Sequence, residues 1–135
     1  MDNSIKRTHV AFDTLTYGGV AYAMHYVTDS SYFHTVHISD IVTYFIADGI
    51  FYVFRDKIIS MFDTEQKQIV SFFAAKYIVV TGGLLIGNLI MGKHNMIGTV
   101  INSAVALGAQ GLIDYAYQKS GFRLGQILKE KKNDN

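Results

Sequence analysis

The sequence predicts an all-α membrane protein, a small bundle of three or four transmembrane helices. Four apolar segments alternate with polar connections, at residues 11–27, 38–54, 69–91 and 96–117. Residues 94–113 contain no Asp, Glu, Lys or Arg. At about 1.5 Å per residue this window is long enough to cross a hydrocarbon core of about 30 Å. The distribution of Lys and Arg along the chain is the third observation.

Positive charge predicts the orientation. With four crossings, the N-terminus, the middle connection and the C-terminal tail share one face, whereas the other face has only Lys93 and Lys76 lies inside a segment. The basic residues on the shared face are Lys6, Arg7, Arg55, Lys57, Lys67, Lys119, Arg123, Lys129, Lys131 and Lys132. Because positive charge is retained on the cytoplasmic side during insertion, both termini are expected there. If the first segment does not cross, only the N-terminus moves to the opposite side.

The first two segments are the less apolar ones. Residues 11–27 contain Asp13 near their start and many Gly and Ala residues, which fits a tilted span, an interfacial helix or a helix of a soluble protein. Residues 38–54 would form a helix only about 26 Å long, with Asp40 near one end and Asp48 within it. The segment ends in aromatic residues beside a basic connection, as is typical of a membrane interface.

The last two segments have the stronger membrane character. Residues 69–91 and 96–117 each begin or end with aromatic residues next to a basic connection, and the chain has no Pro to interrupt a helix. Residues 118–135 form a basic tail. We expect one membrane domain over residues 1–135, because a chain of this length does not divide into two domains.

Several classes of function have no support in the sequence. There is no Cys for disulfides or thiolate chemistry, and the net charge of +1 gives no reason to expect a specific nucleic acid. No nucleophile elbow, phosphate-binding loop or dinucleotide motif occurs. His34 and His37 could share one helical face, but a metal site needs three or four converging ligands. We therefore expect no enzyme, no catalytic or metal-binding residue and no cofactor.

Small residues at helical spacing predict close helix packing, within the chain or between copies in a homo-oligomer. Three pairs have the four-residue spacing that lets helix backbones approach in lipid. They are Gly19 with Ala23, Gly83 with Gly87, and Ala104 with Gly108.

Polar residues inside the segments predict an internal polar seam. They are Asp48, Lys76, Asn88, Asn102, Gln110 and Asp114. A charge at mid-membrane costs about 2.5–3.5 kcal/mol on insertion scales, so we expect a partner for each, with Asp48 and Lys76 as an ion pair. The seam either fixes the register of the helices or provides an ion or proton route through Asp48, Lys76 and Asp114.

The functional hypothesis is a structural membrane protein. It packs through its small-residue faces and presents the basic tail, Lys119, Arg123, Lys129, Lys131 and Lys132, to anionic lipid or to other membrane, capsid or scaffold proteins. The residue usage suits an AT-rich genome such as that of a large DNA virus, in which the protein would link an internal virion membrane to the capsid. The alternatives are an ion or proton transport component and a soluble helical interaction domain.

Overall fold

The computed structural model describes residues 3–28, 37–93 and 96–120, and these residues form four helices and no strand. The helices are α1 (Asn3–Thr28), α2 (Ile38–Ser60), α3 (Glu65–Ile90) and α4 (Met96–Ser120). The prediction of an all-α protein is therefore confirmed. Each helix contains most or all of one predicted segment and extends into the neighbouring polar connections.

Local side-chain chemistry sets the helix ends. Thr64 precedes α3 and its hydroxyl accepts a hydrogen bond from the backbone N–H of Lys67 at 3.3 Å. At the start of α2, the carboxylate of Asp40 accepts from the backbone N–H of His37 at 3.1 Å. After α3 the chain turns at Gly92, whose φ of 71° lies in the left-handed region that glycine adopts without strain.

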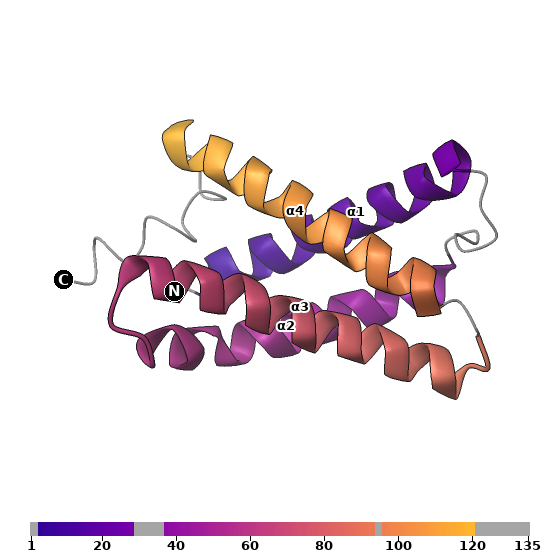
Figure 1. Cartoon of the computed structure of the whole chain (residues 1–135), viewed down its shortest axis with the longest axis horizontal. Coiled ribbons are helices and arrows are strands. Elements are labelled where there is room, and N and C mark those ends of the chain that lie inside the picture. Colours follow the sequence, from indigo (N-terminus) through magenta and orange to yellow (C-terminus); the bar gives the residue numbers. More distant parts are fainter. Residues whose placement is uncertain (1–2, 29–36, 94–95, 121–135) are drawn as a thin grey trace.

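The helices form an up-and-down bundle. α2 and α3 pack as an antiparallel pair, and α1 and α4 cross one another beside that pair (Figure 1). The N-terminus, the α2–α3 connection and the end of α4 lie at one end of the bundle, whereas α1 and α3 end at the other (Figure 1). This arrangement brings the basic residues of α1, α2 and the start of α3 to the same end.

Small residues allow the closest helix contact, between α2 and α3. A Cβ atom added at Gly83 would lie 2.9 Å from the Cβ of Ala47, and one added at Gly87 would lie 3.0 Å from the Cγ2 of Thr43. By contrast, a Cβ added at Gly19 or Gly108 would meet no atom within 4 Å. Gly83 and Gly87 thus lie against α2, while Gly19 and Gly108 face away from the other helices.

Among the described residues, two helices are long and apolar enough to cross a membrane: Glu65–Ile90, with a mean hydropathy of 2.0, and Met96–Tyr117, with 1.5. Only 28% and 33% of their most apolar windows are buried. These helices therefore differ from the core helix of a soluble protein, which is mostly buried. α2 contains Asp40, Asp48 and Arg55 within 18 residues, which lowers its apolar character.

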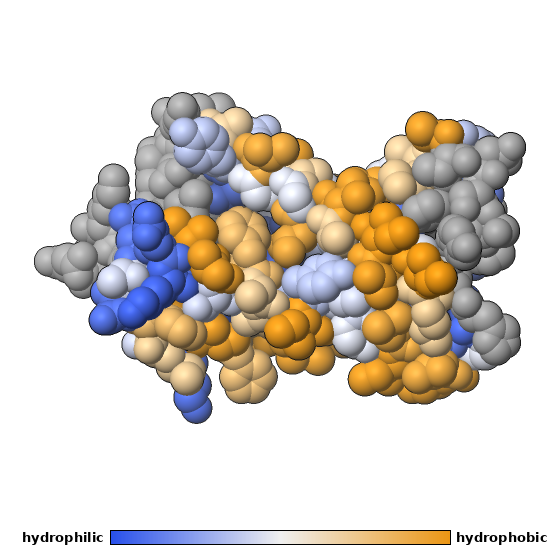
Figure 2. Space-filling view, viewed as in Figure 1, coloured by the Kyte–Doolittle hydropathy of each residue, from blue (hydrophilic) through white to orange (hydrophobic). Residues whose placement is uncertain are grey.

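Polar side chains occupy much of the interior, and apolar side chains cover much of the surface. Leu15, Ile38, Ile90 and Leu112 are between 74% and 80% exposed. The buried polar residues are His9, Asp13, Thr14, Asp48, Arg55, Lys76, Thr81, Asn88, Thr99, Asn102, Ser103, Gln110 and Asp114. Figure 2 shows apolar side chains along one face of the bundle, with hydrophilic ones gathered near the α2–α3 connection.

Candidate functional site: a buried charge cluster

Each of the four helices contributes at least one charged side chain to the interior of the bundle. Asp13 comes from α1, Asp48 from α2, Lys76 from α3 and Asp114 from α4, and none of the four is more than 5% exposed. We call these four residues the charge cluster. Transfer of a lone charge from water into an apolar interior is costly, so the cluster depends on the contacts its members make with one another and with their neighbours.

Lys76 is the centre of the cluster. Its ammonium forms a hydrogen-bonded ion pair with the Asp13 carboxylate, and it lies 3.8 Å from the Oδ1 atom of Asp48. The sequence pointed to Asp48 as the partner of Lys76. In the structure Asp13 is the nearer partner, because α1 lies across the interior from α3 and directs the Asp13 carboxylate onto the ammonium.

Neighbouring polar groups hold Asp13 in place. The Tyr52 hydroxyl donates to the Asp13 carboxylate at 3.3 Å, and the Gln110 side chain donates to the Asp13 backbone carbonyl at 3.1 Å. The same Gln110 amide nitrogen lies 2.8 Å from the Tyr44 hydroxyl, which accepts a second hydrogen bond. These contacts connect α1, α2 and α4, so the charge cluster joins all four helices.

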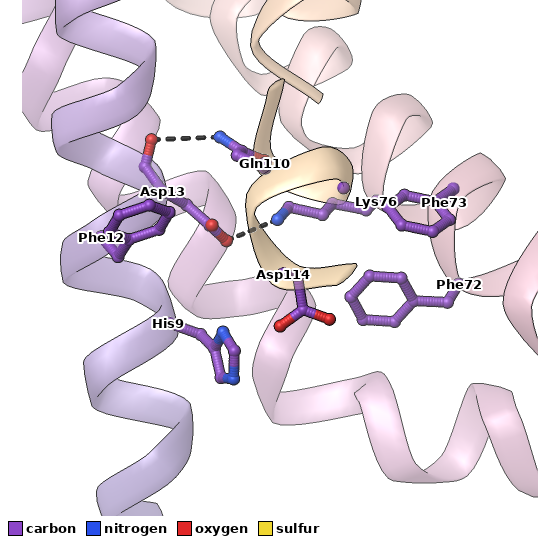
Figure 3. Close-up of a pocket in the computed structure, with 9 residues that line it drawn as sticks. His9, Phe12, Asp13, Phe72, Phe73, Lys76, Gln110 and Asp114 are labelled. Carbon is purple, nitrogen blue, oxygen red and sulfur yellow. Dashed lines mark hydrogen bonds and ion pairs between the residues drawn. The ribbon is translucent and has the colours of Figure 1, made fainter. Parts of the chain in front are cut away.

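The cluster contains more negative than positive groups. Three carboxyl groups surround the single ammonium of Lys76, and the carboxyl oxygens of Asp48 and Asp114 accept no hydrogen bond from the described residues. Beside them lies a cavity of about 10 Å³, lined by His9, Asp13 and Asp114 among others (Figure 3). A space of this size holds about one water molecule.

The remaining predicted seam residues are buried but separate from the cluster. Asn88 donates to the Thr99 hydroxyl at 2.8 Å, which links α3 to α4. Asn102 is 5% exposed, and its side-chain oxygen has no hydrogen-bond partner among the described residues. Along α3, Val80 and Leu84 are buried between Lys76 and Asn88, together with the polar Thr81. Val80 and Leu84 belong to a buried core cluster with Tyr17, Tyr44, Ala47 and Ala106.

Three residues of the site were not among those selected from the sequence: His9, Asp13 and Tyr52. His9 and Tyr52 are 2% and 1% exposed, and their rings stack with centroids 6.0 Å apart. The sequence of α1 does indicate that His9 and Asp13 share a face, because His9, Asp13 and Tyr17 recur every fourth residue along the helix. That face is the buried one.

Charged groups also meet at the two ends of the bundle. At the N-terminal end, Asp56 lies 3.0 Å from the Lys6 ammonium and 2.8 Å from the Arg55 guanidinium. Burial raises the pKa of Asp56, but the hydrogen bonds from Arg55 and Lys6 outweigh it and lower the pKa to about 2. At the opposite end, Lys93 lies 2.9 Å from Asp40.

Other predicted residues lie at the edges of the described chain. His37 precedes α2, whereas His34 lies outside the described residues. Lys119 belongs to the last turn of α4, and the rest of the basic tail also lies outside. Ala23 and Ala104 are exposed. In the described ranges, no three His, Asp or Glu side chains are arranged to hold a metal ion.

In comparisons with known proteins, no family model, curated protein or solved structure matches the chain. The fold and the site therefore define only a class, a helical bundle with a charged interior and an apolar surface.

Proposed function

We propose that this chain is a structural membrane protein whose four helices all cross the bilayer. The observation that carries the proposal is the distribution of residues, with charged and polar groups inside and large apolar side chains outside. In water such a surface would expose apolar area that a soluble protein buries. In lipid the same surface is solvated, and the buried polar groups hold the helices together.

The test of membrane integration is extraction at alkaline carbonate pH, which releases peripheral proteins. We expect the chain to remain in the membrane fraction until detergent is added. Complete release without detergent would contradict the proposal and favour a soluble interaction domain.

The structural role rests on the exposed small-residue pairs. Gly83 and Gly87 pack against α2 of the same chain, but Gly19 on α1 and Gly108 on α4 face outward. We infer that the faces around Gly19 and Gly108 pack against other copies or other membrane proteins. The basic tail, on the side that we assign to the cytoplasm or its equivalent, then remains available to anionic lipid or to an acidic capsid or scaffold protein.

Self-association in the bilayer tests the outward faces. Gly108→Leu should weaken association between fluorescently labelled copies in liposomes, because the leucine side chain keeps the helix backbones apart. Gly82→Leu is the matched control, since a Cβ added at Gly82 also meets no atom within 4 Å. Equal energy transfer for the wild-type protein and both variants would argue against association through this face.

A second candidate function is proton or ion transport, which the carboxyl groups of Asp48 and Asp114 favour because the described residues leave them without hydrogen bonds. The ion pair of Lys76 with Asp13 and the hydrogen bonds of Asp13 with Tyr52 and Gln110 favour the structural role, since they link the four helices to one another. We therefore expect no flux above that of empty vesicles in reconstituted liposomes. A flux that Asp48→Asn abolishes would replace the structural role with the transport one.

A further inference from the structure

A groove lies between the start of α1 and the middle of α2. Its volume is about 390 Å³, and it is open at the surface of the bundle. Its lining consists of Asn3, Lys6, Arg7, Val10, Phe45, Gly49, Tyr52 and Val53. The groove is open beside Gly49, where an added Cβ would meet no atom within 4 Å.

The groove is polar at one end and apolar along its length. Asn3, Lys6 and Arg7 lie on the first turns of α1, at the end of the bundle where the basic residues gather. Phe45 and Val53 are 51% and 71% exposed and border the rest of the groove. A ligand that fits must therefore have an anionic group joined to an extended apolar chain.

The positive end of the groove has charge left for such a ligand. Lys6 lies 3.0 Å from the Asp56 carboxylate, close to Arg7 on the same turn of α1. Arg7 is exposed and makes no hydrogen bond or ion pair with the described residues. The positive end of the α1 helix dipole adds to this charge.

We propose that this groove binds one anionic phospholipid. Its phosphate contacts Arg7 and Lys6, and one acyl chain lies along Val10, Phe45 and Val53. Basic pockets between transmembrane helices on the cytoplasmic side recognise anionic head groups in this way. The inference rests on the proposed membrane location, because only a bilayer supplies this ligand at the groove. It gives the N-terminal end a lipid site separate from the basic tail.

Native mass spectrometry of the detergent-purified protein tests the proposal, with phosphatidylglycerol and phosphatidylcholine added in equal amounts. We expect one phosphatidylglycerol to be retained in preference to phosphatidylcholine. Arg7→Gln should lower that preference about fivefold, the effect of one cation near an anionic lipid surface. Lys57→Gln is the matched control, because it removes one exposed cation of α2 that does not line the groove and should leave the preference unchanged.

A second pair of variants tests the apolar part. Gly49→Leu fills the groove and should abolish retention of the bound lipid, whereas Gly82→Leu, with equally open space at its Cβ, should not. Equal retention by all four variants, or no preference for phosphatidylglycerol in the wild-type protein, would overturn the proposal. Displacement of the lipid by an equal concentration of inorganic phosphate would also overturn it, since the site would then bind a simple anion.

A negative result for the lipid site can be told apart from a negative result for the proposed function. A protein that resists carbonate extraction but binds both lipids equally still spans the membrane and lacks only the lipid site. A protein released by carbonate loses both.

Discussion

At the scale of single residues, Lys76 is the side chain that links the interior of this bundle. The residue is 2% exposed, and its ammonium contacts the carboxylates of Asp13 and Asp48, from two other helices. Its charge also lies 5.5 Å from the centre of the Tyr52 ring, where the aromatic face adds a favourable interaction. One side chain therefore links carboxylates from two other helices and compensates part of the negative charge in the interior.

Replacement of Lys76 by Met should destabilise the protein strongly. The variant leaves buried carboxylates without their cation, for which we expect a cost of about 3–5 kcal/mol in the free energy of unfolding. Denaturation in mixed detergent micelles measures this loss of stability.

A double-mutant cycle with Asp13→Asn provides the control. Removal of both charges should cost less than the sum of the single changes, because the second change removes one of the carboxylates that the first left uncompensated. Costs that add to within about 0.5 kcal/mol would show that the two residues do not interact.

Asp56 makes the stability of the bundle depend on pH in the acid range. Its pKa is about 2 in the folded protein, below the value of about 3.9 for an unperturbed Asp. The folded state therefore binds fewer protons than the unfolded state in this range. The stability that Asp56 contributes is present above pH 4 and is lost as the pH falls from about 4 to about 2.

The difference between the wild-type protein and Asp56→Asn isolates this effect from the other carboxylates. The free energy of unfolding of the wild-type protein should fall more steeply between pH 4 and pH 2 than that of the variant. Parallel curves would contradict the assignment of the low pKa to the contacts with Lys6 and Arg55.

At the scale of elements, the contact between α2 and α3 depends on Gly83. Gly83→Ala would place its Cβ 2.9 Å from that of Ala47, so one of the two helices must shift. Overpacking of this kind costs about 1–3 kcal/mol, which exceeds the gain of about 1 kcal/mol in helix propensity. We expect a net loss of stability in the same unfolding assay.

The neighbouring glycine is the control for Gly83. Gly82→Ala gains the same helix propensity without a contact, so it should stabilise the protein by up to about 1 kcal/mol. The combination of Gly83→Ala with Ala47→Gly should restore much of the loss, because it returns the space to the interface. Equal effects at Gly82 and Gly83 would show that the helices do not approach closely here.

The helices could be predicted from the sequence more fully than their contacts. Charge-free runs and the absence of Pro indicate where α3 and α4 lie, because helix formation in an apolar segment is a local property. The ion pair of Lys76 depends instead on how α1 crosses the bundle. Asp13 stands near the edge of the first apolar segment, where a charge does not by itself predict burial, although its spacing with His9 and Tyr17 follows one helical face.

At the scale of the whole molecule, basic residues gather at one end of the bundle, which is the basis of the proposed orientation. The bundle end with the N-terminus and the α2–α3 connection contains Lys6, Arg7, Arg55, Lys57 and Lys67. The opposite end contains Lys93, which is paired with Asp40. An arrangement with four crossings places the first group on the side that retains positive charge.

Single cysteines in this cysteine-free chain test the central claim, that all four helices cross the bilayer. Ser4→Cys, Ser60→Cys and Met91→Cys place exposed thiols at the two ends of the bundle. In sealed vesicles, an impermeant thiol reagent should reach Ser4→Cys and Ser60→Cys from one side and Met91→Cys only from the other. Labelling of Ser60→Cys and Met91→Cys from the same side would contradict the claim.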